Sequence, residues 1–257
     1  MPKTRIGIQT RPWGPEKNRQ SLPAVLAEIA SAGYDGVEIG AQHLDITQPE
    51  AFRQWVTGHG LQPVAIHVGG EIYDPQAFQA ALAALERTAV FAAQVGALFL
   101  AFSGKAKDGK STEELQIEAD SLCRVGQFCK DNGIRLVYHN HYWEIQGDCR
   151  ELRYLCDHTD PTLVSLCLDV AWVHRAGGNP AKVAKAFLDR IAYFHIKDTT
   201  DAEWCEVGYG DVDLESLFAV IRTREFPWLV VEQDETQRAP VESARMSREY
   251  LRRKLGV

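Results

Sequence analysis

Short apolar runs of strand length alternate with helix-like segments along the whole chain. In the second half, four of these runs each lead to ionisable residues at or just beyond their end, and the runs are residues 134–144 (IRLVYHNHYWE), 163–169 (LVSLCLD), 191–195 (IAYFH) and 228–232 (WLVVE). Nearly continuous apolar strands are typical of parallel sheets covered by helices on both faces. Functional groups at the carboxyl ends of such strands are typical of a parallel α/β barrel. The pattern predicts this architecture.

The first half of the chain continues the same alternation. Further strands are predicted at residues 5–9, 34–39, 61–68 and 97–102, and helices at 21–32, 49–57, 74–95, 111–132, 149–158, 180–188, 214–222 and 241–255. Eight βα units in strict alternation favour right-handed crossovers and closure into a (β/α)₈ TIM barrel. We therefore expect a single α/β domain over residues 1–257. A doubly wound open sheet is the alternative, but the turn after the first strand lacks a GxGxxG motif.

Charge and composition narrow the class of protein. The 257 residues carry a net charge of −7, which argues against a nucleic-acid partner because phosphate binding needs a basic surface. The longest apolar runs fall short of the ~18 residues of a membrane span, and the start of the chain has no signal-peptide core. The six cysteines form no CxxC pair, which favours reduced thiols. We expect a cytoplasmic enzyme with no membrane association, compatible with a homodimer or homotetramer.

Three of the strand ends carry groups that suit a metal. Since alternate residues of a barrel strand point inward, Asp169, His195 and Glu232 can share one pocket. Each of them alone is more often a helix cap or a surface group. Together with a carboxylate or imidazole from residues 134–144 they form a set suited to Mn²⁺, Mg²⁺, Co²⁺ or Zn²⁺.

The sequence resembles the xylose-isomerase-like TIM-barrel superfamily of sugar phosphate isomerases and epimerases, which also includes inosose dehydratases and 3-keto-sugar lyases. The resemblance extends over nearly the whole chain and is carried by residues 34–39 (YDGVEI), 65–70 (AIHVGG), 138–144 (YHNHYWE), 167–180 (CLDVAWVHRAGGNP), 194–198 (FHIKD), 207–213 (VGYGDVD) and 230–235 (VVEQDE). It implies a single divalent metal held by strands five to eight, with Asp169, His195 and Glu232 as ligands.

The fifth strand departs from the ketose 3-epimerase pattern, which has a glutamate where this chain has His139. Glu144 is the predicted fourth ligand, because a third carboxylate suits a hard Mn²⁺ or Mg²⁺ ion, and His139 is the alternative. The histidine that does not bind metal, His139 or His141, is the predicted catalytic base, since an imidazole titrates near neutral pH.

Six further residues are candidate substrate contacts. Glu38, His67 and Lys197 lie near strand ends, and the resemblance places Trp172, His174 and Arg175 close to the substrate. Each of the first three is equally suited to a salt bridge at the rim of the pocket.

The predicted function follows from the metal. A divalent ion bound to adjacent carbonyl and hydroxyl oxygens acidifies the carbon between them and stabilises the enediolate. We predict a metal-dependent isomerase or epimerase, with Mn²⁺ favoured, acting on a ketose or keto-sugar. An inosose-type dehydratase or 3-keto-glycoside lyase, acting on a sugar or cyclitol, is the alternative. An endonuclease IV-like DNA repair enzyme and a non-catalytic sugar-binding barrel are more remote.

Overall fold

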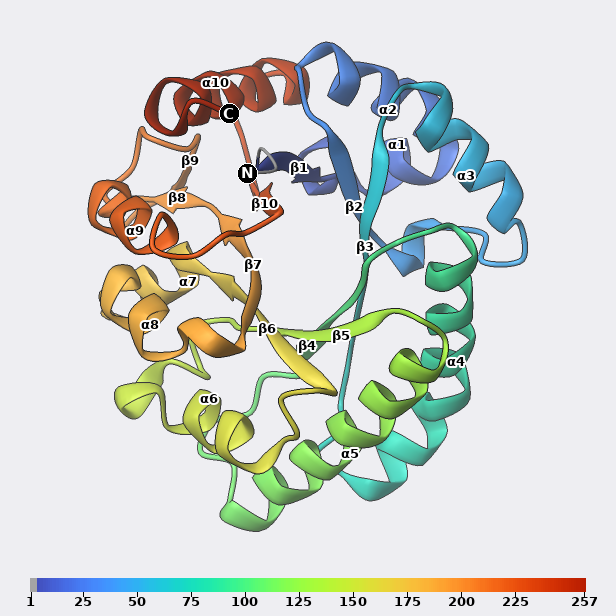
Figure 1. Ribbon diagram of the computed structural model, residues 1–257, viewed down its shortest axis with the longest axis vertical. Helices are drawn as coiled ribbons and strands as arrows, with labels where there is room; N and C mark the ends of the chain where they lie inside the picture. Colours follow the sequence, from blue (N-terminus) through green and yellow to red (C-terminus); the bar gives the residue numbers. More distant parts are fainter. Residues whose placement is uncertain (1–3) are drawn as a thin grey trace.

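Eight parallel strands close into a barrel, in the order β1-β2-β3-β4-β5-β6-β7-β10 (Figure 1). The computed structural model describes residues 4–257. The barrel strands are β1 (Arg5–Gln9), β2 (Gly36–Gly40), β3 (Gln62–Gly70), β4 (Phe99–Gly104), β5 (Arg135–His139), β6 (Val164–Asp169), β7 (Ile191–Ile196) and β10 (Trp228–Val231). This topology confirms the predicted (β/α)₈ barrel.

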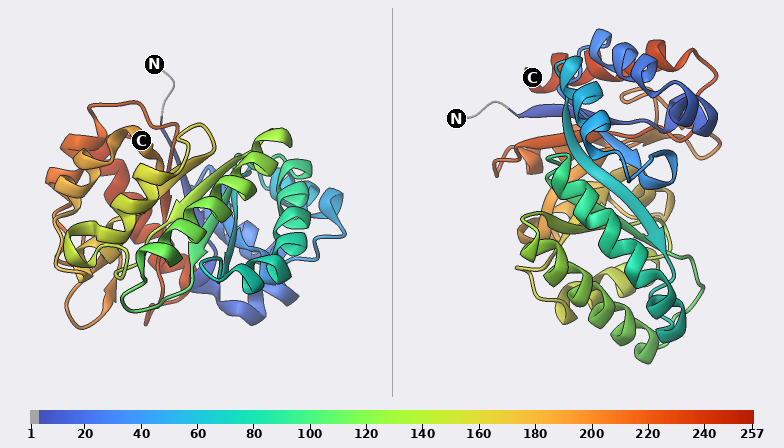
Figure 2. Two further views of the ribbon diagram at one scale, coloured as in Figure 1. Left: turned by 90° about the horizontal axis from the view of Figure 1, so that it is seen from below. Right: turned by 90° about the vertical axis from the view of Figure 1, so that its right-hand side faces the viewer.

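Helices surround the barrel, as the side views of Figure 2 show. They are α1 (Gly14–Gln20), α2 (Leu22–Ser31), α3 (Pro49–Gly58), α4 (Pro75–Gln94), α5 (Thr112–Asp131), α6 (Gln146–His158), α7 (Val170–Arg175), α8 (Pro180–Ala186), α9 (Leu214–Ile221) and α10 (Pro240–Leu255). The last helix packs beside α2 and closes the ring (Figure 1). Within residues 4–257, none of these helices has the length and apolar character needed to cross a membrane.

Four of the short elements were not expected from the sequence. Helix α1 forms in a stretch predicted to be a loop, and β8 (Asp198–Thr199) pairs with β9 (Trp204–Cys205) in a small antiparallel ribbon. Helix α7 begins directly after Asp169, whose carboxylate accepts a hydrogen bond from the backbone N–H of Trp172 at 2.8 Å. These elements are two to seven residues long. They are therefore too short to show the hydrophobic periodicity used to predict the others.

The barrel has its own core inside the ring of strands. Its buried residues are Val64, Ala65, Ala101, Val137, Cys167, Tyr193, Trp228 and Val230. Because side chains alternate along a strand, the residues two positions further on point inward in the next layer. Asp169, His195 and Glu232 follow Cys167, Tyr193 and Val230 in this way, so the apolar core forms the floor of a polar layer.

A buried carboxylate anchors the loop that follows β9. Asp198 accepts hydrogen bonds from the backbone N–H groups of Thr199, Gly208, Gly210 and Val212 at 2.8–3.1 Å. A side chain at Gly210 would collide with the Asp198 carboxylate, so this approach requires glycine. The motif at residues 207–213 is thereby tied to the end of β7.

Candidate metal centre

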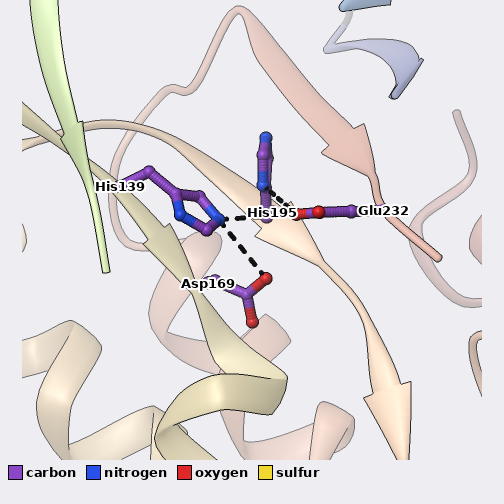
Figure 3. Close-up of side chains that lie close together, drawn as sticks. All are labelled: His139, Asp169, His195 and Glu232. Atoms are coloured by element: carbon purple, nitrogen blue, oxygen red, sulfur yellow. Dashed lines mark ion pairs between the residues drawn. The ribbon is translucent and has the colours of Figure 1, made fainter. Parts of the chain in front are cut away.

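Four buried side chains converge at the carboxyl ends of β5, β6, β7 and β10 (Figure 3). They are His139, Asp169, His195 and Glu232, and one ligand atom from each lies within 4.8 Å of all the others. The Nε2 atom of His139 is 3.6 Å from Asp169 Oδ2 and 3.4 Å from Glu232 Oε2. The Nδ1 atom of His195 is 2.5 Å from Glu232 Oε2. The three residues expected to share a pocket do so.

Apart from these contacts with one another, the ligand atoms of the group lack hydrogen-bond partners. Within residues 4–257 this holds for His139 Nε2, Asp169 Oδ2, His195 Nδ1 and Glu232 Oε2. A buried polar atom without a partner is costly, and four of them directed at one point fit a bound cation. Two imidazole nitrogens and two carboxylate oxygens form a donor set for a divalent transition metal.

Burial and the neighbouring charges shift the pKa values of the group in opposite directions. Burial on its own lowers the pKa of His139, but the Asp169 and Glu232 carboxylates raise it above the usual range. Burial favours protonated Glu232, but Lys197 and His195 hold its pKa well below the usual range. The carboxylates therefore keep protons on the histidines when no metal is bound. A metal has to displace these protons.

Asp169 is both a helix cap and a candidate metal ligand, two roles that were expected to be alternatives. Its Oδ1 atom caps helix α7, while Oδ2 faces the group of four. The amide of Asn140 fixes the backbone of Asp169 on both sides, accepting from its N–H at 2.9 Å and donating to its carbonyl at 3.2 Å. Asn140 directly follows β5, so it joins the strand ends that carry His139 and Asp169.

Glu144, the predicted fourth ligand, is not in the group. Its carboxylate accepts hydrogen bonds from the Tyr138 hydroxyl at 2.8 Å and from the backbone N–H of His141 at 2.7 Å. Tyr138 faces out of the barrel because its neighbour His139 faces in, and its hydroxyl also reaches Glu118 of α5 at 3.3 Å. Glu144 thus folds back towards the outer face of β5. The alternative, His139, stands in its place.

Two predicted substrate contacts lie in a hydrogen-bond chain behind the histidines. Glu38 is fully buried, and its two carboxylate oxygens contact His67 Nδ1 at 2.9 Å and His195 Nε2 at 3.1 Å. His67 Nε2 lies 2.8 Å from the Ser103 hydroxyl, which lies 3.2 Å from His139 Nδ1. Glu38 therefore supports the candidate ligands from behind, while His67 also reaches the wall of the pocket.

A cavity of about 210 Å³ opens onto the group. Its wall includes His67, Ser103, His139, His141, Trp172, Glu232 and Asp234. A larger cavity of about 470 Å³ lies at the amino ends of the strands and is lined mainly by apolar side chains such as Phe99 and Trp228. The smaller cavity is the candidate active site, since His139 and Glu232 of the group line it and it lies at the functional face of the barrel.

His141 is placed to act as a base beside the group. Its ring stacks on Trp143 with centroids 4.4 Å apart and lines the cavity, and within residues 4–257 its buried Nδ1 atom has no partner. Burial, together with the nearby His139, lowers the pKa of His141 to about 2. The ring is therefore neutral near neutral pH with its lone pair available, but it is a much weaker base than the near-neutral imidazole expected from the sequence.

Lys197 is fully buried next to the group. Its Nζ atom lies 2.5 Å from Asp234 Oδ2, 3.7 Å from Asp169 and 3.8 Å from Glu232. Arg11 pairs with the other oxygen of Asp234 at 2.5 Å. Lys197 therefore offsets part of the negative charge of the carboxylates, and its closest partner is Asp234.

The residues of α7 divide between the cavity wall and its support. Trp172 lines the cavity and packs edge-on against Trp204, with centroids 4.7 Å apart. The Arg175 guanidinium lies 3.6 Å from the centre of the Trp204 ring and donates to Thr199 at 2.8 Å. His174 is not among the described residues that line the cavity. Arg175 thus braces the wall, and Trp172 faces the cavity.

Sequence reasoning missed eight residues of the cavity wall: Gln9, Arg11, Gly40, Gln42, Val68, Gly69, Ser103 and Asp234. Two of them carried a usable signal. Ser103 lies two positions after the inward-facing Ala101, and Asp234 lies two positions after Glu232. The strand alternation used for the other residues applies to both.

The fold and the site define a class: α/β-barrel enzymes with a buried group of side chains that could bind a metal. The chain belongs to the family described as the xylose isomerase-like TIM barrel, whose model matches residues 26–254. This confirms the resemblance seen in the sequence motifs.

Curated relatives and solved structures agree with this membership. An inosose dehydratase of Geobacillus kaustophilus is 24% identical, with 97% of this chain and 94% of that protein covered. An inosose dehydratase of Clostridium botulinum is 28% identical, and there the match spans 58% of this chain and 59% of the relative. The crystal structure of a sugar phosphate isomerase/epimerase from Parabacteroides distasonis has a TM-score of 0.83 at 21% identity, covering 97% of this chain and 94% of that one. The chain is thus similar in sequence to inosose dehydratases and shares its fold with a sugar phosphate isomerase/epimerase.

Proposed function

We propose that this protein is a divalent-metal-dependent enzyme that removes a proton from the carbon beside the carbonyl of a ketose, keto-sugar or keto-cyclitol. One observation carries the proposal: within residues 4–257, four buried atoms without other hydrogen-bond partners face one point at the carboxyl ends of the barrel strands. Membership of the xylose isomerase-like TIM-barrel family and the similarity to inosose dehydratases support it.

The proposed ligands are His139, Asp169, His195 and Glu232, with His139 taking the place first predicted for Glu144. Mn²⁺ is the preferred ion in this proposal, and Co²⁺ and Zn²⁺ fit the second imidazole better than Mg²⁺ does. Such an ion supplies Lewis-acid stabilisation for the negative charge that develops on the carbonyl and hydroxyl oxygens of the substrate.

The remaining residues bind the substrate and move its proton. His141, whose ring lines the cavity and whose Nδ1 atom has no partner among residues 4–257, takes the proton, although burial makes it a weak base. Trp172 and His67 flank the substrate from the cavity wall. The Lys197 ammonium, 3.7 Å from Asp169, partly neutralises the carboxylates and so limits their repulsion of a negatively charged intermediate. Return of the proton by His141 completes an isomerisation or epimerisation.

Elimination is the second candidate, as in an inosose-type dehydratase or 3-keto-glycoside lyase. It is favoured by His139, which stands where the ketose 3-epimerase pattern has a glutamate, and by the similarity to inosose dehydratases. In this reaction His141 passes the proton that it has taken from the carbon to the departing hydroxyl, so that water leaves. Asp234, on the cavity wall, stays paired with Lys197 and Arg11.

Two kinds of substrate distinguish isomerisation or epimerisation from elimination. The protein is incubated with Mn²⁺ in D₂O, first with a panel of ketoses and then with a keto-inositol, and the products are analysed by mass spectrometry and NMR. Deuterium incorporation without loss of mass supports the isomerase or epimerase, and loss of water supports the dehydratase. Substrate binding without either change would contradict the proposal and indicate a sugar-binding barrel. Cleavage of abasic duplex DNA would indicate the repair enzyme instead.

We also propose a cytoplasmic protein that acts on small molecules as a homodimer or homotetramer. The six free cysteines and the net charge of −7 are compatible with this setting. Light scattering after size-exclusion chromatography measures the oligomeric state.

A further inference from the structure

The two histidines of the candidate metal centre use different ring nitrogens. His139 directs Nε2 at the group, and His195 directs Nδ1. A neutral imidazole has one protonated and one lone-pair nitrogen, and only the lone pair binds a metal. We propose that Glu38 is a positioning residue that sets the tautomer of both rings, so that each presents a lone pair to the metal. This inference rests on the proposed metal site.

The link from Glu38 to His195 is direct. Glu38 Oε2 lies 3.1 Å from His195 Nε2 and also accepts from the Tyr193 hydroxyl at 2.7 Å. Because an ionised carboxylate can only accept hydrogen bonds, Nε2 has to carry the proton. The lone pair of the neutral ring then lies on Nδ1, the atom that faces Glu232.

The link from Glu38 to His139 runs through two residues. His67 Nδ1 donates to Glu38 Oε1 at 2.9 Å, which leaves a lone pair on His67 Nε2. The Ser103 hydroxyl, 2.8 Å away, donates to that lone pair. Its oxygen is then free to accept from His139 Nδ1 at 3.2 Å. The lone pair of His139 is thereby left on Nε2, the atom that faces Asp169 and Glu232.

The two links join at one carboxylate deep in the barrel. Glu38 and His195 are fully buried, and His139 is 1% exposed. Few water molecules can therefore reach these three groups, whereas His67 and Ser103 between them are partly buried on the cavity wall. Where water is scarce, the direction of each hydrogen bond dictates the next one along the chain. A single acceptor on β2 thus orients ligands on β5 and β7.

Replacing the Glu38 carboxylate by an amide should reverse the direction of the hydrogen bonds that lead to His139. In Glu38→Gln the amide oxygen should face His195 and Tyr193, which are two donors, and the amide nitrogen should face His67. The protons of His67 and Ser103 then reverse, and the proton of His139 moves to Nε2, where it blocks the metal. We expect the Mn²⁺ dissociation constant to rise ~10–100-fold, as for other outer-sphere partners of metal ligands.

A second substitution separates this reversal from a simple loss of charge. In Ser103→Ala the chain is cut, so the tautomer of His139 is no longer dictated in either direction. Ser103→Ala alone should weaken Mn²⁺ binding less than Glu38→Gln. The double variant should bind Mn²⁺ more tightly than Glu38→Gln alone, because the reversed chain is broken. Tyr193→Phe is the matched control, since it removes a hydrogen bond to Glu38 without changing any tautomer.

The test combines Mn²⁺ titration calorimetry on these variants with ¹⁵N-histidine NMR of the Zn²⁺-loaded protein, and circular dichroism verifies folding. We expect protons on Nδ1 of His139 and on Nε2 of His195, and the partial rescue by Ser103→Ala. The inference is overturned alone if the wild type binds metal but Glu38→Gln binds it equally well, if the rescue is absent, or if the spectra show the opposite tautomers. If the wild type binds neither Mn²⁺ nor Zn²⁺, the proposed metal site fails and the inference fails with it.

Discussion

Two buried polar clusters lie on opposite sides of strand β5. The inner cluster is the candidate metal centre, formed by His139, Asp169, His195 and Glu232. The outer cluster lies between the strand and helices α5 and α6, and consists of Lys110, Glu118, Tyr138, Glu144 and Glu151. Adjacent residues of one strand, His139 and Tyr138, begin the two clusters. Both bring carboxylates together away from water.

The clusters differ in what balances their charge. The outer cluster contains its own cation, because Lys110 Nζ lies 2.7 Å from Glu118 and 3.3 Å from Glu151. In the inner cluster the nearby cation, Lys197, makes its short contact with Asp234 and lies further from Asp169. A carboxylate cluster paired internally stabilises the fold. One whose ligand atoms remain unpartnered fits a cation from outside.

Removing the cation of the outer cluster should have the largest effect on stability. Lys110→Met leaves Glu118 and Glu151 buried without a counter-charge, and breaking such a buried pair typically costs ~3–5 kcal/mol in the free energy of unfolding. Chemical denaturation measures this loss. The Mn²⁺ affinity of the folded variant should remain that of the wild type. A large loss of affinity would show that the two clusters are not independent.

The inner cluster should show metal binding that depends on pH. The carboxylates raise the pKa values of His139 and His195 against the effect of burial, so both rings are protonated at low pH. Each proton that must leave before metal binds lowers the affinity about tenfold per pH unit below that pKa. Calorimetry in several buffers should therefore show tighter Mn²⁺ binding and less proton release as pH rises. A pH-independent affinity would contradict protonated histidine ligands.

The outer cluster should make the fold less stable as pH rises. Burial raises the pKa of Glu144 from 4.5 to about 7, so its protonated form is favoured in the folded state. The contribution of this group is therefore fully present below pH 4.5 and is lost as pH rises towards 7. Glu144→Gln should flatten this slope, by on the order of 1–3 kcal/mol between these pH values. Thermal unfolding across the range measures it, and an unchanged slope would argue against a protonated Glu144.

Removing the Asn140 amide, which connects the ends of β5 and β6, should have the smallest effect on Mn²⁺ binding. Asn140→Ala removes the amide that fixes the backbone of Asp169, so this ligand is held less well while all four ligand atoms remain. We expect a rise of about tenfold in the Mn²⁺ dissociation constant, with the helical circular dichroism unchanged. Asn132→Ala is the matched control, because that amide bonds only to the end of α5.

The fold was largely predictable because each barrel strand is buried on both faces and leaves a continuous apolar run. Within the strands, alternation also placed Asp169, His195 and Glu232 correctly towards the barrel axis. Glu144 was predicted as the fourth ligand, but it does not lie in the inner cluster. It follows the end of β5, where strand alternation no longer determines which way a side chain points. Its outward turn depends on the contact with Tyr138.

The depth at which a side chain lies along the barrel axis also could not be predicted from the sequence. Glu38 and His67 were expected at the substrate, but the stagger between strands places Glu38 behind the histidines. Stagger is a property of the closed sheet and cannot be counted along one strand. The sequence pattern identified both residues as polar strand ends and could not show that they point to other side chains.

The central claim is that the inner cluster binds one metal through His139, and it is tested most directly by metal content. Elemental analysis after Mn²⁺ loading compares the wild type with Asp169→Ala, His139→Ala and Glu144→Gln. The account predicts about one equivalent in the wild type and in Glu144→Gln, and loss of metal in the other two. Loss in Glu144→Gln with retention in His139→Ala would contradict the choice of ligand. Absence of metal from all four proteins would contradict the metal centre itself.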